Sequence, residues 1–329
     1  MSRAWPVLLA GLFLAVLPPM VLAERTPQEW LDHMTRSMRE SNYTGTFVYR
    51  YGDRLEAMRI AHRAGPDGRR ERLRSLSGRR REIIRDGQAV TCVFADRDAV
   101  VVDRRQTRNP LSDLVPSGAD TLGQNYQLDV AGVGRIADRE VIRLRIKPRD
   151  GYRYGYELAI DREAGLLLGS QLLEEGEGSP VEQIMFTSVA QPEDIPDSAL
   201  EQSISGDGFV WHRRDTSSDG VSEVSDDSQW TVGSVPPGFQ LDMRERHTLP
   251  GRDVMVEHWL YTDGLASVSV YIERTGNEIG AFHGRSRMGA LNVYGRKVEG
   301  YQVVVVGEVP AVTVESMGRS IEQKNGAGP

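Results

Sequence analysis

Cysteine and clustered histidine are scarce in this sequence, and both scarcities narrow the classes of protein that it can encode. The chain has 329 residues and a single cysteine, Cys92, so no disulfide within the chain can stabilise the fold. We interpret Cys92 as a small buried residue of the strand-like stretch AVTCVFA. The six histidines are scattered, with no pair at the i,i+4 spacing and no zinc-finger spacing. We therefore predict no metal and no cofactor.

Catalytic motifs are lacking as well. GVGRIA at 132–137 resembles a dinucleotide fingerprint, but the residues after it alternate as in a strand, whereas the fingerprint requires a helix there. GRSRMG at 284–289 lacks the glycine spacing of a nucleophile elbow. We interpret the carboxylates in the turn-like EEGEG as solvated. We predict a binding protein with no catalytic residues, and we keep a hydrolase as a third hypothesis, because catalytic residues can converge in the fold alone.

Lysine is scarce too, whereas arginine is concentrated in one region. Only three of the forty basic residues are lysines, and the formal charge is −7. The negative total argues against nucleic acid as the partner. Between 54 and 85, however, eleven arginines face four acids. Arg79, Arg80 and Arg81 form the densest group, and guanidinium groups match phosphate geometry, so we name them as candidate anion-binding residues. The alternative is a solvated strand face.

One long apolar run exists, at the N-terminus. Residues 4–23 are interrupted by three prolines and end in small residues at 21 and 23, as in a signal peptide. We predict a signal peptide at 1–23, cleaved so that the mature chain begins at about Glu24 and is exported. A retained membrane anchor is the alternative.

The remaining length exceeds one typical core, so two domains are expected. We predict an N-terminal domain at 24–204, a linker at 205–229, a C-terminal α+β domain at 230–322 and a flexible tail at 323–329. The first domain begins with a helix capped by Thr26 and Glu29 and continues as about eleven short strands, with a lid-like loop at 109–125. The linker is rich in Ser, Gly and Asp, although Phe209 and Trp211 suggest docking, and a surface loop is the alternative.

The hairpin YRYGYELAIDREAGLLLGS at 152–170 carries many large apolar side chains. We interpret it as a strand from Tyr152, a turn at Asp161 to Gly165, and a returning strand. A twisted sheet with such residues on its concave face makes a cavity for acyl chains, and an ordinary core is the alternative. The candidate cavity residues are Phe47, Tyr49, Tyr51, Tyr154, Tyr156, Leu158, Ile160, Leu166 and Leu168.

Several stretches together resemble the MucB/RseB family of envelope-stress regulators. They run in order from near residue 40 to about 318 and include YTGTFVYRYGDRLEAMRIAH, RERLRSLSGRRREIIRDG, YRYGYELAIDREAGLLLGSQLL, WTVGSVPPGF, YTDGLASVSVYIE and VVVVGEVPAVTVESM. The resemblance implies a mostly antiparallel α+β fold. Its N-terminal domain would be an open half-barrel like that of periplasmic lipoprotein carriers.

The resemblance also implies a function in the periplasm. The protein would bind the periplasmic domain of a membrane-anchored anti-sigma factor, shield that factor from regulated proteolysis and so keep the stress sigma factor silent. Lipopolysaccharide, lipid A or a lipidated protein would release it, and the protein would form homo-oligomers. The alternative is a periplasmic lipoprotein or lipid carrier, which shares the N-terminal fold and needs no partner-binding domain.

Overall fold

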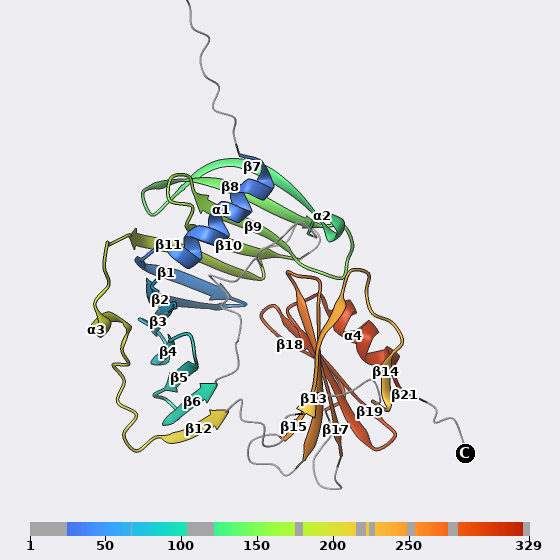
Figure 1. Cartoon of the computed structure of the whole chain (residues 1–329). Coiled ribbons are helices and arrows are strands. Elements are labelled where there is room, and N and C mark those ends of the chain that lie inside the picture. The colour runs from blue at the N-terminus through green and yellow to red at the C-terminus, as the bar shows by residue number, and fades with distance from the viewer. Residues whose placement is uncertain are drawn as a thin grey trace, which may run out of the picture.

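The structure is a computed structural model that describes residues 25–66, 68–103, 122–174, 180–214, 222–223, 228–248, 254–275 and 282–324. Within these residues the chain forms a large curved sheet and a smaller sheet beside it (Figure 1). The predicted signal peptide at 1–23, most of the predicted lid-like loop and most of the tail lie outside the described residues.

The N-terminal sheet has twelve strands in the order β12-β6-β5-β4-β3-β2-β1-β11-β10-β9-β8-β7. Eleven of them fall within 24–204: β1 (Tyr43–Tyr51), β2 (Arg54–Arg63), β3 (Arg70–Ser75), β4 (Arg81–Arg85), β5 (Val90–Phe94), β6 (Ala99–Asp103), β7 (Tyr126–Ile136), β8 (Arg139–Pro148), β9 (Gly155–Asp161), β10 (Leu167–Leu173) and β11 (Glu182–Ala190). These eleven pair antiparallel, and because β12 and β7 remain as the two ends of the order, the sheet is open.

Helix α1 (Pro27–Glu40) begins as the sequence predicts. Glu29 N–H donates to Thr26 Oγ1 at 3.2 Å, and Thr26 N–H donates to Glu29 Oε2 at 2.6 Å, which completes a capping box. Its buried residues, Trp30, Leu31, Met34 and Met38, pack with Leu158 and Ile160 of β9. The helix therefore covers part of the concave face of the sheet (Figure 1). Two short helices, α2 (Leu122–Asn125) and α3 (Asp197–Leu200), complete this domain.

The predicted linker contains strands. β12 (Val210–Arg214) pairs parallel with β6, and β13 (Ser222–Glu223) pairs with the C-terminal sheet. Phe209 packs on the small core of Val93, Val100 and Ile204, and Trp211 lies opposite Val100. Phe209 and the pairing of β12 thus join residues 209–214 to the N-terminal sheet.

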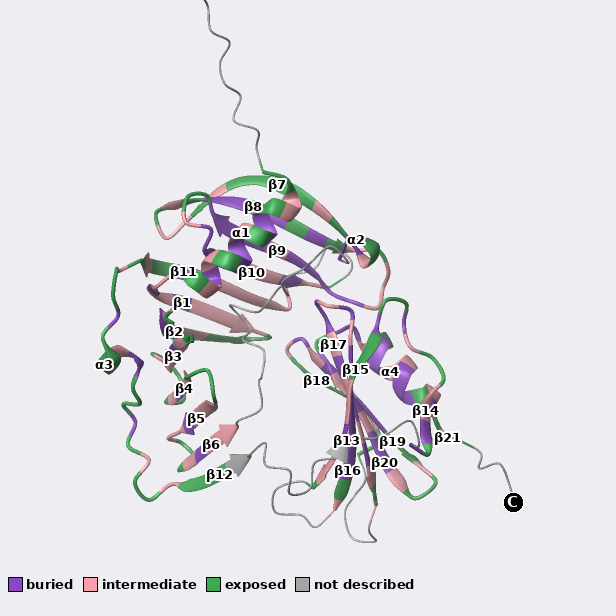
Figure 2. Cartoon of the chain, in the orientation of Figure 1, coloured by how far each residue is buried: buried purple, intermediate pink, exposed green. Residues whose placement is uncertain are grey.

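The C-terminal sheet has the order β13-β15-β16-β17-β20-β19-β18. Its remaining elements are β14 (Trp230–Val232), β15 (Gln240–Thr248), β16 (Met255–Thr262), β17 (Ser267–Arg274), β18 (Gly284–Met288), β19 (Leu291–Val298), β20 (Tyr301–Gly307), α4 (Ala311–Ser320) and β21 (Ile321–Gln323). Strands β14 and β21 pair separately. Val314 and Met317 of α4 are buried in the second core, beside Trp259 and Val305. Figure 2 shows burial concentrated where helices and sheets face one another.

One local prediction was wrong. Strand β9 begins at Gly155 and not at Tyr152, because Tyr152, Arg153 and Tyr154 are held by contacts with the C-terminal domain. In the C-terminal sheet, residues 284–307 form three strands, and the Met288–Leu291 connection folds β18 back on β19. The mostly antiparallel α+β class, the open sheet and the smaller C-terminal α+β unit are confirmed. No helix in the described part of the chain has the length and apolar character needed to cross a membrane.

Candidate binding cavity and domain interface

A cavity of about 250 Å³ opens on the concave face of the N-terminal sheet, on the part that α1 leaves uncovered. Strands β1 to β4 and β9 to β11 supply most of its wall, and Glu308, which follows β20, reaches it from the C-terminal domain. The apolar residues of the lining are Phe47, Tyr49, Met58, Leu73, Ile83, Tyr156, Leu172 and Ile184. Both domains therefore contribute to one cavity.

The strand register explains why these residues meet. Phe47 lies opposite Met58 on one side and Phe186 on the other, and Tyr49 lies opposite Ile184. Side chains alternate between the faces of a strand, so partners in register share the concave face. The fourth pairing in this row, Leu172 with Tyr156, continues the same face into β9.

The polar end of the cavity is built from carboxylates. Tyr49 donates its hydroxyl to Glu182 Oε2 at 3.0 Å, and Glu182 Oε1 accepts the Ala290 N–H of the C-terminal domain at 3.3 Å. Burial, and then the charge of Glu182, raise the pKa of Tyr49. Desolvation and the same charge raise the pKa of Glu308. The two carboxyl groups at this end of the cavity therefore favour protonation of Glu308 or a cationic group bound beside them.

Basic residues at the cavity floor are paired. Arg81 lies 2.6 Å from Glu56, and Arg85 lies 3.8 Å from Glu71, which also contacts His62 Nδ1 at 3.2 Å. Glu71 is buried, so a charge in this position requires partners of this kind. The arginine charges of this otherwise apolar chamber are thus neutralised by neighbouring carboxylates.

The structure distributes the sequence-predicted cavity residues over three places. Phe47, Tyr49 and Tyr156 line the cavity, and Tyr51 stacks on Tyr49 with ring centroids 5.0 Å apart. Tyr154 lies at the domain interface. The remaining four are packed in the core beneath α1: Leu158, Ile160, Leu166 and Leu168. Sequence reasoning missed Met58, Leu73, Ile83, Leu172 and Ile184, whose alternation is visible in the sequence but whose face depends on register.

The three arginines of the predicted anion site do not converge. Arg79 is exposed and pairs with Asp96 at 3.0 Å, Arg80 is exposed in the loop before β4, and Arg81 points into the cavity toward Glu56. Successive residues at the start of a strand point to opposite faces, which separates them.

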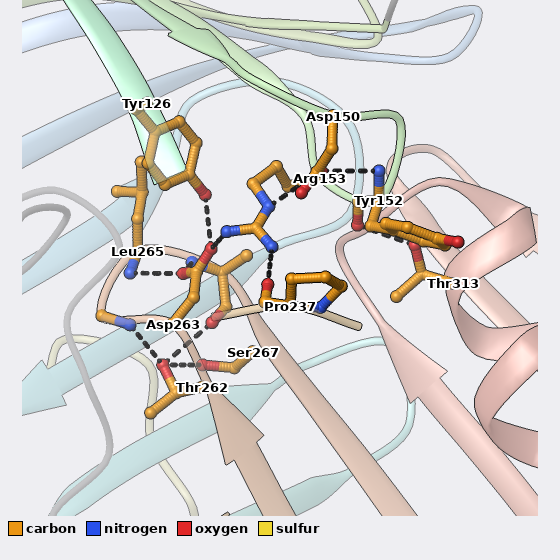
Figure 3. Close-up of polar contacts among 12 residues, drawn as sticks. Tyr126, Asp150, Tyr152, Arg153, Pro237, Thr262, Asp263, Leu265, Ser267 and Thr313 are labelled. Atoms are coloured by element: carbon orange, nitrogen blue, oxygen red, sulfur yellow. Dashed lines mark hydrogen bonds and ion pairs between the residues drawn. The ribbon is translucent and has the colours of Figure 1, made fainter. Parts of the chain in front are cut away.

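The second feature of the site is a buried ion pair between the domains (Figure 3). Arg153 Nη1 donates to Asp263 Oδ2 at 2.8 Å, and neither side chain has exposed surface. Arg153 Nε donates to Asp150 at 3.1 Å, and its second amino group donates to the Pro237 carbonyl. Tyr126 adds a 2.8 Å hydrogen bond to Asp263. Every polar edge of the guanidinium is thus engaged, as burial of a charge requires.

The stretch from 152 to 154 makes further contacts with the C-terminal domain. Thr313 Oγ1 donates to the Tyr152 carbonyl at 2.7 Å, and Asn292 Nδ2 donates to the Tyr154 hydroxyl at 2.9 Å. Leu265 and Ala290 complete the apolar core of the N-terminal domain. The two domains therefore meet through a specific interface next to the cavity, a relationship that no local pattern in the sequence encodes.

Fold and site together define a two-domain binding protein with an apolar chamber at the junction of its domains. The MucB/RseB N-terminal domain model matches residues 26–204, and the MucB/RseB C-terminal domain model matches residues 224–322. The chain belongs to the MucB/RseB family.

Curated relatives carry names of regulatory proteins. The chain is 33% identical over 331 residues to the sigma factor AlgU regulatory protein MucB of Pseudomonas aeruginosa, covering 98% of each chain. It is 26% identical to the sigma-E factor regulatory protein RseB of Escherichia coli K12, covering 89% of each. The family is thus one of regulators and not of enzymes.

Solved structures give the same assignment. MucB in complex with MucA(peri) superposes with a TM-score of 0.69 at 30% identity, covering 91% of this chain and 99% of that chain. A further complex, Pseudomonas aeruginosa MucA/MucB, gives 0.70 at 30% identity, with the same coverage. The similarity therefore extends over both domains.

Proposed function

We propose that this protein is a periplasmic negative regulator that binds the periplasmic part of a membrane-anchored anti-sigma factor. Membership of the MucB/RseB family in both domains supports the proposal, as do the complexes of the relative MucB with MucA. Binding shields the anti-sigma factor from regulated proteolysis and keeps the sigma factor silent. The predicted signal peptide at 1–23 delivers the chain to the periplasm.

The release step of the proposal rests on the cavity. A lipid or lipopolysaccharide acyl chain occupies the chamber lined by Phe47, Tyr49 and Tyr156, where each buried methylene contributes about 0.8 kcal/mol. The observation that carries this step is that Glu308 of the C-terminal domain lines the same chamber. A ligand there contacts both domains and so favours one arrangement of them over another.

Linkage then connects lipid to partner. If lipid lowers the affinity for the anti-sigma factor by some factor, the partner lowers the affinity for lipid by the same factor. The ion pair of Arg153 with Asp263 joins the two domains, so a change in their relative arrangement acts on this contact.

The test measures the affinity of the mature chain for the periplasmic part of its anti-sigma factor by calorimetry, with and without lipid A. We expect weaker binding with lipid and slower protease cleavage of the anti-sigma segment when the chain is present. Equal affinities with and without lipid would refute the release step, and unchanged cleavage would refute shielding. The proposal includes self-association, which sedimentation of the mature chain checks.

A lipoprotein or lipid carrier is the second candidate, and the apolar chamber is the observation that favours it. A carrier binds and delivers lipid without affinity for an anti-sigma factor. Lipid loading together with absent capture of the anti-sigma segment would favour the carrier.

A further inference from the structure

A second and larger hollow lies on the opposite, convex face of the N-terminal sheet. It encloses about 540 Å³, within the usual range for small-molecule sites. Strands β1, β2, β3 and β11 form its floor, and Ala199 of α3 forms a wall. The three charged side chains that line it are all arginines, Arg59, Arg72 and Arg74. We call this hollow the convex groove.

The register places like charges side by side in this groove. Arg59 of β2 lies directly opposite Arg74 of β3. On its other side Arg59 lies opposite Thr46 of β1, and Thr46 in turn lies opposite Ser188 of β11. Like charges in directly opposed positions destabilise a sheet. In the described part of the chain neither Arg59 nor Arg74 forms an ion pair. Two guanidinium groups therefore share a hollow without an anion to offset their repulsion.

The nearest carboxylate is already occupied. Glu82 lies opposite Arg74 on β4, but it accepts hydrogen bonds from Arg72 Nη2 at 2.7 Å and from the Ser203 N–H at 2.8 Å. Desolvation by burial alone would raise the pKa of Glu82, but the hydrogen bonds from Ser203 and Arg72 together outweigh it and hold this pKa low. Glu82 thus neutralises Arg72 and leaves the charges of Arg59 and Arg74 available.

The wall of the groove is fixed in place. Arg63 and Arg70 each bind Asp197 Oδ1 at 2.7 Å, and Ile195 and Leu200 pack with Ala61. Arg72 Nη1 donates to the Ala199 carbonyl at 3.5 Å. The segment around α3 is therefore held across the convex face, so the groove exists before any ligand arrives, which lowers the cost of binding.

We propose that the convex groove binds a phosphate group. Guanidinium forks match the geometry of phosphate oxygens, and the hydroxyls of Thr44, Thr46 and Ser188 supply neutral donors along the same row. A phosphate dianion between Arg59 and Arg74 replaces their repulsion with attraction. The small apolar side chains of Ala61, Ala190 and Ala199 accommodate the uncharged part of the ligand. The groove lies on the other face of the sheet from the acyl chamber, so this inference does not depend on the proposed function.

Inorganic phosphate is the first probe, measured by calorimetry and by the thermal midpoint of the mature chain. Arg59→Gln with Arg74→Gln should weaken phosphate binding about a hundredfold or more, since the double variant removes two charged hydrogen-bond donors to the anion. The same double variant should be at least as thermostable as the wild type without phosphate, because the repulsion is gone, and this shows that it folds. Added salt should weaken binding by the wild type.

Arg79→Gln with Arg80→Gln is the matched control, because it removes the same charge from exposed positions of the same domain. Unchanged phosphate affinity in this control, with loss in the groove variant, supports the groove. Equal losses in both variants, loss in the control alone, or no binding by the wild type would overturn it.

Vesicles then separate the two sources of phosphate. Binding to phosphatidylcholine vesicles that contain phosphatidic acid, when it depends on Arg59 and Arg74 and is absent without phosphatidic acid, assigns the groove to a lipid headgroup. Binding of inorganic phosphate without such vesicle binding assigns it to a soluble phosphate. Failure of the groove variant to alter either would refute the site while leaving the anti-sigma proposal untouched.

Discussion

Arg153 of the N-terminal domain and Asp263 of the C-terminal domain form an ion pair of 2.8 Å in which neither side chain has exposed surface. Asp263 also accepts the N–H groups of Leu265 and Ala266 at 2.9 and 2.7 Å, and these bonds shape the turn between β16 and β17. One carboxylate therefore both builds its own hairpin and holds the other domain. Any rearrangement of the domains has to expose or re-pair these charges, which makes the pair a determinant of one relative arrangement.

Arg153→Ala should lower the free energy of unfolding by about 3–5 kcal/mol, because it leaves the buried Asp263 without its cationic partner. Urea unfolding measures the loss. Arg145→Ala is the control: its 3.2 Å pair with Glu157 is solvent-exposed on the arginine side and should contribute less than about 1 kcal/mol.

The interaction energy between Arg153 and Asp263 can be measured with the same urea unfolding experiment. Arg153→Ala with Asp263→Ala should cost less than the sum of the single losses, since each residue is the other's partner. Additive losses, or equal losses at Arg153 and Arg145, would show that the interdomain pair does not hold the domains.

Glu308 makes stability depend on pH. Desolvation and the charge of Glu182 raise its pKa above the ordinary 4.5. A folded-state pKa above the unfolded one favours folding while the group is protonated, and this stability is lost as pH rises through the raised value. Glu308→Gln should therefore be more stable than the wild type at neutral pH, and the difference should shrink as pH falls toward 4.5. Urea midpoints across this range measure it.

Solvent reaches the Glu308 side chain, so screening keeps the effect modest. Glu322→Gln, an exposed position of the same domain, is the control and should leave the pH profile unchanged. Parallel profiles for the two variants would contradict the role of Glu308.

Elements with local causes were predictable from the sequence. The capping box of Thr26 and Glu29 predicts the start of α1. An Asp-Gly pair is typical of a tight hairpin, and Asp86-Gly87 lies in the β4–β5 connection, where Gly87 has a φ of +82°. These features depend on residues a few positions apart, so the sequence contains them directly.

Relationships over long separations were not predictable. Arg153 meets Asp263 across 110 positions, and this contact ends the strand pattern that Tyr152 and Tyr154 suggest. Likewise, the alternation of arginines in β3 is visible, but only the register reveals that Arg74 lies opposite Arg59 on the convex face while Arg81 of β4 belongs to the concave one. A single sequence specifies which residues alternate, and the tertiary pairing decides which alternating sets meet.

Gly165, in the β9–β10 turn, has a φ of +73°, and a Cβ there would lie 2.6 Å from His33 Nε2 and 2.5 Å from Ser37 Oγ of α1. Gly165→Ala should destabilise the protein through both backbone strain and overpacking against the helix. Gly208→Ala is the matched control, because its φ of +78° imposes the same strain with no atom within 4 Å. The difference in unfolding free energy should be about 1–3 kcal/mol, the usual cost of overpacking. Equal losses would mean that α1 does not pack tightly on the turn.

Ile184→Trp should block the chamber, since Ile184 lines it. Filling space equivalent to two acyl methylenes removes about 1.6 kcal/mol of binding, so the affinity for lipid A should fall about tenfold or more. Met185→Trp adds the same side chain on the opposite face of β11, where Met185 is exposed, and should bind lipid A as the wild type does. Calorimetry with lipid A measures both variants.

Capture of the anti-sigma segment then tests whether lipid binding is coupled to partner release. The Ile184→Trp variant should hold its partner even when lipid is added. Wild-type lipid affinity in Ile184→Trp would place the lipid elsewhere, whereas lost lipid binding with partner release still intact would separate the chamber from regulation.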